Sequence, residues 1–521
     1  MNLRSSLLIL IAFLLNSCAN IKGISGGPED KKAPGILSAK SSPAQQKNFK
    51  EHSLYFYFDE WIRLESPQSN ITISPSLQYQ PKYILKGKEL IIEFDEREQL
   101  KENTTYSIQF GESIKDITVG NVQRDLRYIF STGNFIDSLK IVGQVKDAYS
   151  NHVKEKILVG LYNNLHDSAF QKLKPFYFSF TDTAGRFKLE NLSPGTYKLY
   201  ALLDKNQNYY FDQFGESIAF LDQSIQINDS LQKQFNLYLS ESKPPLFIKD
   251  KVSGNGKLKL QFNEMPDSLK ITFNNETNFQ WLQTADSLLI WNLKSDPDSL
   301  RIKYPGHLDS FIISARIKSN APDPVSLNLK ERILKPGEFP IFSFKDPVLN
   351  VYNSKISTTD SSITNLSVQM DRLDPRSFSI LGNFKNKLEF KLIFEKASVV
   401  LWPDLENKTD TFTIRYLEKS ALSQLTLKLD SLNTNAAYIL ELVEGEQVRT
   451  TRILSKFDQT KELLFPNLLP GNYKLRLIED KNQNQRWDAA NYELKNQAET
   501  VWNFSLPELR ADWDIAVTIK P

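Results

Sequence analysis

Two short stretches of the sequence carry oxygen-bearing side chains at alternating positions. One runs from Asp204 to Asp212, and the other runs from Asp480 to Asp488, 276 residues later. Each places an aspartate first, asparagines third and fifth, and a second aspartate ninth. Carboxylate and amide oxygens are the ligands that Ca²⁺ prefers, and a loop that curls around an ion turns alternate side chains inward. The spacing therefore predicts two calcium loops, with the ligands Asp204, Asn206, Asn208 and Asp212 in the first and Asp480, Asn482, Asn484 and Asp488 in the second.

Both loops depart from the calcium loop of an EF-hand. The glycine expected at the sixth position is Tyr209 in one loop and Gln485 in the other, and neither loop has an acid at the twelfth position. With two carboxylates per loop, the affinity for Ca²⁺ would be weak. The alternative interpretation is a turn rich in Asx residues, whose side chains bind their own backbone and only stiffen the domain. Both interpretations stay open, and no other feature of the sequence requires a cofactor.

The sequence has no arrangement of residues typical of an enzyme. The four histidines stand alone, at positions 52, 152, 166 and 307. The acidic pairs Asp59–Glu60 and Asp95–Glu96 could serve glycoside hydrolysis, but each stands at the end of an expected strand and fits a role in the fold. Phosphate-binding loops, dinucleotide fingerprints and nucleophile or zinc-protease motifs are absent from the sequence. We therefore predict a protein without enzymatic activity.

Composition and charge narrow the class of protein further. Of the 521 residues, 40% are hydrophobic, enough to fill several cores, and the 33 Phe and 20 Tyr favour strands. The 64 basic and 62 acidic residues leave a net charge of +2, so there is no basic excess to bind nucleic acid. Cys18 is the only cysteine, which excludes an intrachain disulfide and a cysteine-based zinc site. We expect several domains and no nucleic-acid partner.

The N-terminus has the pattern of a signal for lipid attachment. Arg4 precedes the apolar run LLILIAFLL at 7–15, which is too short to cross a bilayer as a stable helix. The run ends in Leu-Asn-Ser-Cys, which resembles the cleavage site of a bacterial lipoprotein with Cys18 as the residue to be acylated. The alternative is an ordinary secretory signal, which we disfavour because the single cysteine stands at the cleavage point. We expect an outer-membrane lipoprotein of the cell envelope, anchored through Cys18, with the face of the membrane left open.

Short runs of alternating apolar residues follow this N-terminal region. SLYFYFDE at 53–60 and ELIIEFDE at 89–96 are two of them, and turn residues separate the runs. A period of two in short runs is typical of antiparallel strands in a β-sandwich. No helical pattern of useful length follows the signal. The expected fold class is therefore all-β, a string of sandwich modules after a lipoprotein signal peptide.

Several of these stretches resemble known families. LYFYFDEWIRL, LKENTTYSIQFGESIKDITVGN and YIFSTG, within about 34–134, resemble the bacterial Ig-like domain of the S-layer SbsA type. The upstream ISGGPEDKKAPGILSAKSSP is similar to the lead-in of Bacteroidetes lipoproteins of that family. FYFSFTDTAGRFKLENLSPGTYKLYALLD at 176–204 resembles the carboxypeptidase regulatory-like, or transthyretin-like, sandwich, and a second copy follows at about 420–519. These resemblances imply a chain of Ig-like and transthyretin-like β-sandwiches.

Together these signals divide the chain into seven segments. In order they are a lipoprotein signal peptide (1–17), a flexible tether (18–35), an SbsA-type Ig-like domain (36–134), a transthyretin-like sandwich (137–240), a β-sandwich of unassigned type (245–335), an Ig-like domain (339–419) and a second transthyretin-like sandwich (420–519).

The predicted function is a non-catalytic structural, adhesive or partner-presenting role in the cell envelope. The expected partners are the membrane, through the lipid anchor at Cys18, and an envelope protein or glycan. The alternative is a carbohydrate-binding lipoprotein that uses the regulatory-like sandwiches, which would require exposed aromatic rings. The candidate rings are Trp61, Tyr209, Tyr210, Trp487 and Trp502, although Phe211 and Trp487 are each also expected to plug the edge of a sandwich.

Overall fold

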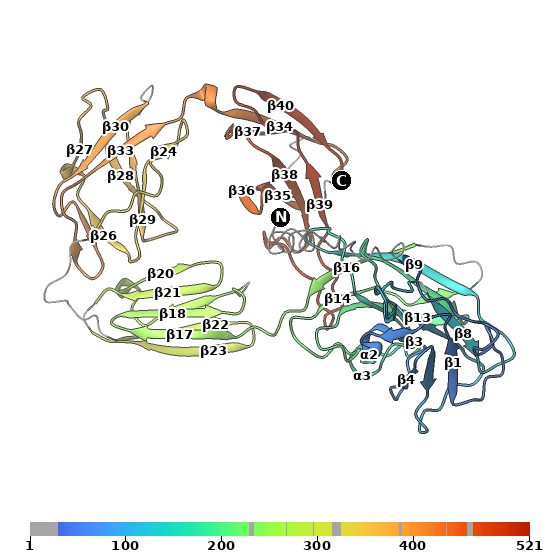
Figure 1. Ribbon diagram of the computed structural model, residues 1–521. Coiled ribbons are helices and arrows are strands. Elements are labelled where there is room, and N and C mark those ends of the chain that lie inside the picture. Colours follow the sequence, from blue (N-terminus) through green and yellow to red (C-terminus); the bar gives the residue numbers. More distant parts are fainter. Residues whose placement is uncertain are drawn as a thin grey trace, which may run out of the picture. The chain divides into compact units, whose positions relative to one another are not determined.

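The structure is a computed structural model that describes residues 30–124, 126–228, 234–266, 268–294, 296–314, 325–384, 388–433, 435–455 and 462–521. The predicted signal peptide, Cys18 and the tether up to residue 29 lie outside these residues. Within them, the prediction of an all-β chain of sandwich modules is confirmed (Figure 1). The described α-helices are the short α2 (Pro67–Asn70) and α3 (Ala169–Lys172). Neither these nor any other described helix has the length and apolar character needed to cross a membrane.

The chain divides into two compact units that interleave along the sequence. The first unit comprises the residues up to Val145, Lys154–Phe211 and Phe220–Leu237. The second comprises Lys146–Val153, Asp212–Ala219 and Tyr238–Pro521. The division falls within the strands β9 (Leu139–Asp147), β14 (Ser217–Phe220) and β16 (Gln234–Glu241).

The first module of the first unit confirms the alternation read from the sequence. Leu54 pairs with Ile92 and Phe56 pairs with Leu90, and all four side chains are buried. The sheets of this module have the strand orders β1-β5-β4, β3-β6-β8 and β2-β7. Its strands are β1 (Ser53–Tyr57), β2 (Ile62–Leu64), β3 (Thr72–Ser74), β4 (Lys82–Lys86), β5 (Glu89–Glu93), β6 (Thr105–Gln109), β7 (Ile114–Asp116) and β8 (Arg127–Ser131).

The next module of the first unit contains the segment that repeats later in the chain. Phe187, Leu189 and Tyr197 are buried, as the alternation predicts. Gly143 lets two strands approach closely, because a Cβ there would lie 2.1 Å from the carbonyl oxygen of Phe235. Besides β9, β14 and β16, the strands here are β10 (Leu158–Tyr162), β11 (Tyr177–Phe180), β12 (Arg186–Leu192), β13 (Gly195–Leu203) and β15 (Ile225–Ile227).

Three further groups of strands in the second unit each enclose an apolar cluster. The first group is β17 (Ile248–Gly254), β18 (Lys257–Phe262), β19 (Lys270–Phe273), β20 (Phe279–Gln283), β21 (Ser287–Asn292), β22 (Asp298–Tyr304) and β23 (His307–Ile313), with the 3₁₀ helix η1 (Glu276–Asn278). The second is β24 (Ile333–Leu334), β25 (Ile341–Ser343), β26 (Val348–Val351), β27 (Ile356–Thr358), β28 (Ser367–Met370), β29 (Ser377–Leu381), β30 (Glu389–Phe394), β31 (Val399–Leu401), β32 (Leu405–Glu406) and β33 (Asp410–Tyr416), with η2 (Asn353–Lys355). The third follows η3 (Lys419–Ala421) and is β34 (Ser423–Leu429), β35 (Ala437–Glu444), β36 (Gln447–Leu454), β37 (Glu462–Leu468), β38 (Tyr473–Asp480), β39 (Val501–Ser505) and β40 (Asp514–Ile519).

A tryptophan joins the first two of these groups. Trp402 follows β31, is 1% exposed and packs against Trp291 of β21. Its indole N–H donates to the carbonyl oxygen of Asn292 at 3.1 Å. Asp346 accepts from the indole N–H of Trp291 at 3.2 Å and forms an ion pair with Lys257 at 2.6 Å. Apolar packing and charged hydrogen bonds therefore both hold this junction.

Candidate functional site

The second oxygen-rich loop begins where a central strand ends. β38 lies between β35 and β39, and its last residue, Asp480, is 2% exposed. The carboxylate of Asp480 accepts hydrogen bonds from the backbone N–H groups of Asn484 at 3.1 Å and Gln485 at 3.0 Å. Asn482 Oδ1 accepts from the N–H of Asn484 as well, at 3.1 Å. The first half of the loop is thus wrapped around the carboxylate of Asp480.

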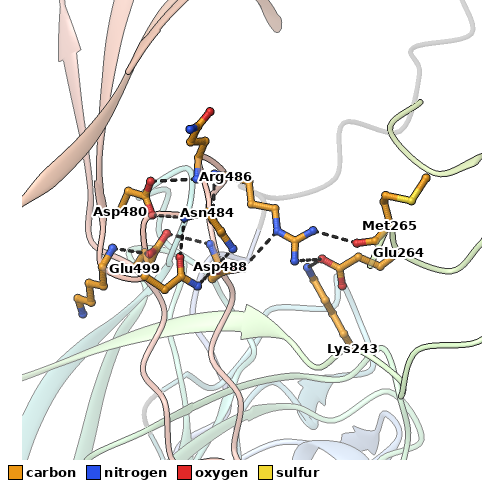
Figure 2. A network of polar contacts seen from close by, with 11 residues as sticks. Lys243, Glu264, Met265, Asp480, Asn484, Arg486, Asp488 and Glu499 are labelled. Carbon is orange, nitrogen blue, oxygen red and sulfur yellow. Dashed lines mark hydrogen bonds and ion pairs between the residues drawn. The ribbon is translucent and has the colours of Figure 1, made fainter. Parts of the chain in front are cut away.

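The carboxylate of Asp488 binds two side chains of the same loop. Its Oδ2 accepts from the amide groups of Asn482 at 2.6 Å and Asn484 at 2.8 Å. All four side chains predicted as ligands in this loop therefore belong to one hydrogen-bonded network (Figure 2).

A glutamate that the spacing did not reveal completes the second loop. Glu499 is 4% exposed and stands two residues before β39. Its carboxylate accepts from the backbone N–H groups of Lys481 at 2.7 Å and Asp488 at 3.1 Å. Burial raises the pKa of Glu499, and the nearby charges of Asp488 and Asp480 raise it further. Glu499 therefore fastens both ends of the loop from a position outside the motif.

The first copy has a comparable glutamate nearer in sequence. Glu216 is fully buried, and its Oε2 accepts from the backbone N–H groups of Asp212 and Gln213, both at 3.3 Å. Each copy therefore uses a buried glutamate to bind the N–H of its last motif aspartate. The glutamate follows that aspartate by four residues in the first copy and by eleven in the second. This difference explains why alignment at a constant offset missed the pair.

The first loop repeats the backbone pattern of the second. Asp204 accepts from the N–H groups of Asn208 at 3.2 Å and Tyr209 at 2.7 Å. Asn206 Oδ1 accepts from the N–H of Asn208 at 3.3 Å, and Asn208 Oδ1 accepts from the N–H of Tyr210 at 2.8 Å. The predicted ligand Asp212 belongs to the second unit, where it meets Glu216 as described.

Both loops make the sharp turn at their sixth position without glycine. Tyr209 has φ of +72° and Gln485 has φ of +64°, in the left-handed region that glycine favours. The N–H of each of these residues is held by the first aspartate of its loop. These hydrogen bonds offset part of the strain of the turn, so the loop keeps its shape with a side chain at this position.

The chemistry of the loops fits a hard cation, because every predicted ligand side chain offers oxygen. The hydrogen bonds expected of an Asx-rich turn are also present in both loops. Across the described parts of the chain, no group of three or more His, Cys, Asp or Glu side chains is arranged to hold a metal ion. A calcium ion here would therefore need the asparagine oxygens as well, and calcium binding stays a prediction.

Calcium should stabilise the full chain if the loops bind it. For a weak site with a Kd of roughly 10⁻⁴ to 10⁻³ M, about 10 mM Ca²⁺ should add roughly 1.4–2.7 kcal/mol to the unfolding free energy of the module that binds it. Calorimetric titration, and melting in Ca²⁺ compared with EDTA, measure this effect. The variant Asp480→Asn should lose the contribution of the second loop, whereas Asp250→Asn on an exposed strand should keep it. No heat of binding and equal melting temperatures would leave the Asx turn as the role of these loops.

An arginine connects the second loop with another part of the second unit. Arg486 Nη1 donates to the carbonyl oxygen of Met265 at 3.0 Å, and its guanidinium lies 3.9 Å from Glu264 and 3.8 Å from Asp488 (Figure 2). Glu264 also forms an ion pair with Lys243 at 2.5 Å. The loop therefore anchors the segment that follows β18 to the end of β38.

The aromatic residue of the second loop packs against a distant segment of the same unit. The Trp487 ring lies 5.0 Å from the ring of Tyr149, centroid to centroid, and its indole N–H donates to the carbonyl oxygen of Glu499 at 3.1 Å. Arg476 lies over the Tyr149 ring at 4.1 Å, donates to its hydroxyl at 2.6 Å and pairs with Glu441 at 2.8 Å. We name Tyr149, Arg476, Glu441 and Trp487 the tyrosine clasp.

The other candidate aromatic residues do not form the exposed, nearly coplanar set of rings that a sugar-binding platform needs. Tyr209 is half-buried in the wall of an open depression in the first unit, with Tyr83, Phe178 and Lys174. The Tyr209 ring meets that of Phe178 at 5.2 Å and 76°, so the two rings form no common plane. The residues that line this depression include no carboxylate and no imidazole. Tyr210 and Trp502 are half-buried, and Trp61 is 62% exposed.

The acidic pairs considered for catalysis bind structural partners. Asp59 accepts from Lys32 Nζ at 2.8 Å and from the N–H of Gly35 at 2.7 Å, and Lys32 lowers the pKa of Asp59. Asp95 accepts twice from Arg97, at 2.8 and 2.9 Å, which holds the pKa of Asp95 well below its usual range. Residues 30–35, the end of the predicted flexible tether, are thus bound to the first module.

Comparison with known proteins assigns one part of the chain. Residues 30–132 match the family model described as "Bacterial Ig-like domain". No curated protein matches the sequence. Among solved structures, the S-layer protein rSbsC(31-844) is 10% identical with a TM-score of 0.16, and the match covers 88% of this chain and 66% of that chain.

Two further structures show the same level of similarity. BcpA, the major pilin subunit of Bacillus cereus, is 10% identical with a TM-score of 0.14 over 74% of this chain and 99% of that chain. The Bacteroides ovatus protein SGBP-B, in complex with a mixed-linkage heptasaccharide, is 8% identical with a TM-score of 0.17 over 72% of this chain and 91% of that chain. The family match, together with the buried alternation of the first module, identifies residues 30–132 as a bacterial Ig-like domain.

Proposed function

We propose that this chain is a non-catalytic protein of the cell envelope, anchored to a membrane through Cys18, whose braced β-sandwiches present their surfaces to a partner. The observation that carries the proposal is that the charged side chains in and around the second loop are engaged in contacts within the fold. In the second unit, Asp480 and Glu499 accept from backbone N–H groups of the second loop, and Asp488 accepts from the side-chain amides of Asn482 and Asn484. Arg486 donates to the carbonyl oxygen of Met265. These groups hold segments together and converge on no reacting centre.

The same distribution argues against the two alternatives. Glycoside hydrolysis by paired carboxylates needs those carboxylates to face a cleft, and no carboxylate lines the depression in the first unit. A glycan-binding platform needs exposed, nearly coplanar rings. Trp487 packs in the tyrosine clasp, and Tyr209 packs edge-on against Phe178. The structural role accounts for these residues more simply.

Replacing Cys18 tests the anchor. In a bacterial host that processes lipoproteins, the native chain should incorporate labelled palmitate and partition into detergent, and Cys18→Ser should lose both properties completely. Melting of the purified variant should match that of the native chain, because Cys18 precedes the folded modules. Palmitate incorporation by the variant, or its absence from the native chain, would contradict the anchor. Protease treatment of intact cells and pull-down with the soluble part would then give the exposed face and the partner.

A further inference from the structure

We propose that three exposed apolar residues at one end of the Ig-like domain, Trp61, Ile117 and Val119, rest in the interfacial layer of the membrane that holds the lipid anchor. We name these residues the apolar rim. The inference rests on the proposed function, because the anchor at Cys18 is what would bring this end of the domain to the bilayer. It adds a second contact, made by the protein itself.

The apolar rim is formed by two neighbouring segments. Trp61 is 62% exposed, Ile117 is 56% exposed and Val119 is 47% exposed. The N–H of Ile117 donates to the carbonyl oxygen of Trp61 at 3.2 Å, which places the two segments side by side. Exposed apolar residues that stand singly need no explanation, but three gathered on adjacent segments indicate a surface that contacts another phase or partner.

The segment that carries Ile117 and Val119 is held by the carboxylate of Asp116. Asp116 is fully buried and accepts from the N–H groups of Val119 at 2.6 Å, Gly120 at 3.0 Å and Asn121 at 2.7 Å. These N–H groups lower the pKa of Asp116 to about 2, so it stays ionised across the physiological range. A turn held by three hydrogen bonds loses little further conformational entropy on contact with a surface.

The indole of Trp61 packs against the turn at Gly87. Gly87 turns between β4 and β5 with φ of +64°, and a Cβ there would lie 2.7 Å from the Trp61 ring. The ring therefore lies against the backbone of this turn and keeps its outer part in solvent. Tryptophan in this position is suited to the interfacial layer of a membrane, where an amphipathic ring is favoured at the level of the headgroups.

The anchored end of the chain reaches the domain beside the apolar rim. The carbonyl oxygen of Asp30 accepts from Asn121 Nδ2 at 2.9 Å, two residues beyond Val119. Lys32 forms an ion pair at 2.8 Å with Asp59, two residues before Trp61. Asp30 is twelve residues from Cys18, a length that spans at most roughly 40 Å when fully extended. An acylated Cys18 therefore keeps this end of the domain close to the bilayer.

The charges around the apolar rim are compatible with a lipid surface. Lys88 Nζ donates to the carbonyl oxygen of Asp59 at 2.6 Å, and Lys32 pairs with the carboxylate of the same residue. Burial raises the pKa of Glu60, and the charge of Asp116 raises it further. Basic side chains near the headgroups attract anionic lipids. Because Asp30, Asp59 and Asp116 all act on Glu60 beside these lysines, the local charge is mixed, and the partner that fits this end of the domain is the headgroup layer of a phospholipid membrane.

The test uses the full chain with Cys18→Ser, so that acyl chains make no contribution. Its binding to vesicles of phosphatidylethanolamine and phosphatidylglycerol should fall about tenfold or more when Trp61, Ile117 and Val119 are all replaced by Ser. The matched control replaces Leu308 and Ile312, which are 65% and 75% exposed, by Ser and should bind as before. Melting curves confirm that each variant is folded. Equal vesicle binding by the rim variant and its parent, or an equal loss in the control, would overturn the proposal.

A second measurement uses the acylated native chain in vesicles that contain brominated lipid. Trp61 should be quenched, and Trp61→Phe should remove that part of the quenching. If Cys18 carries no acyl chain but vesicle binding still depends on the apolar rim, the anchor fails and the membrane contact stands. If the rim variant loses binding to isolated envelope polysaccharide and keeps vesicle binding, the apolar rim binds a glycan and the membrane proposal is overturned.

Discussion

Replacing Trp402 by Ala should destabilise the junction between the first two strand groups of the second unit by about 3–5 kcal/mol. The side chain is 1% exposed, packs against Trp291 and donates to the carbonyl oxygen of Asn292. The substitution removes a large apolar volume and leaves that acceptor without its donor. Because Trp402 belongs to an apolar cluster separate from the two module cores, the modules should stay folded while the junction loosens.

Native-state hydrogen exchange on the full chain resolves this effect, since a chain of several modules does not unfold in one step. Faster exchange is expected in β21 and β31, with the other strands of both groups less affected. Trp281→Ala is the matched control, because Trp281 lies on the neighbouring strand β20 and is 44% exposed. The cost at Trp281 should stay below about 1 kcal/mol. Similar costs at the two positions would show that Trp402 does not carry the junction.

The second large effect is expected in the tyrosine clasp. Arg476→Ala leaves the carboxylate of Glu441, whose side chain is 15% exposed, without its cation, and it removes the guanidinium from the Tyr149 ring. Removing one partner of a buried ion pair costs about 3–5 kcal/mol. We expect Tyr149 to separate from the sheet of β35 and β38, which should change the fluorescence of Trp487 and speed exchange in both strands.

An exposed ion pair provides the comparison for this prediction. Arg415 and Glu389 are 2.5 Å apart, with side chains that are 67% and 48% exposed. Arg415→Ala should cost about 0–1 kcal/mol, because solvent screens such pairs and replaces them readily. If Arg476→Ala is equally mild, the tyrosine clasp is held by packing and by the amide of Asn151, which donates to the carbonyl oxygen of Val501 at 2.7 Å.

Local periodicity was sufficient to predict several of the strands and their buried faces. Phe187, Leu189 and Tyr197 are buried as expected, because alternation along a strand places every second residue on one side of the sheet. The two aromatic residues that were expected to plug a sandwich edge both pack against other side chains. Phe211 stacks on Phe170 at 5.4 Å, and Trp487 packs with an apolar cluster of the last sheet.

Periodicity and spacing in the sequence could not predict the contacts that complete the site. Glu499 binds the loop from eleven residues past Asp488, and no spacing rule fixes that distance. Tyr149 and Arg476 are 327 residues apart in the sequence and meet only in the tertiary fold, which neither local pattern predicts. The motif therefore predicted which side chains form the loop, and the tertiary fold determines what the loop holds.

The unequal spacing of the two buried glutamates has a practical consequence. The longer second copy places its extra residues in a small turn, where Asn491 and Asn496 exchange backbone hydrogen bonds at 2.8 and 3.0 Å. Because Glu216 reaches the equivalent backbone with four residues, the sheet forms with either length of this excursion. Doubling a loop of this kind costs only about 0.6 kcal/mol in chain entropy. The turn between Asn491 and Asn496 is therefore a natural position for grafting foreign peptides, which would make this chain a carrier for displaying them.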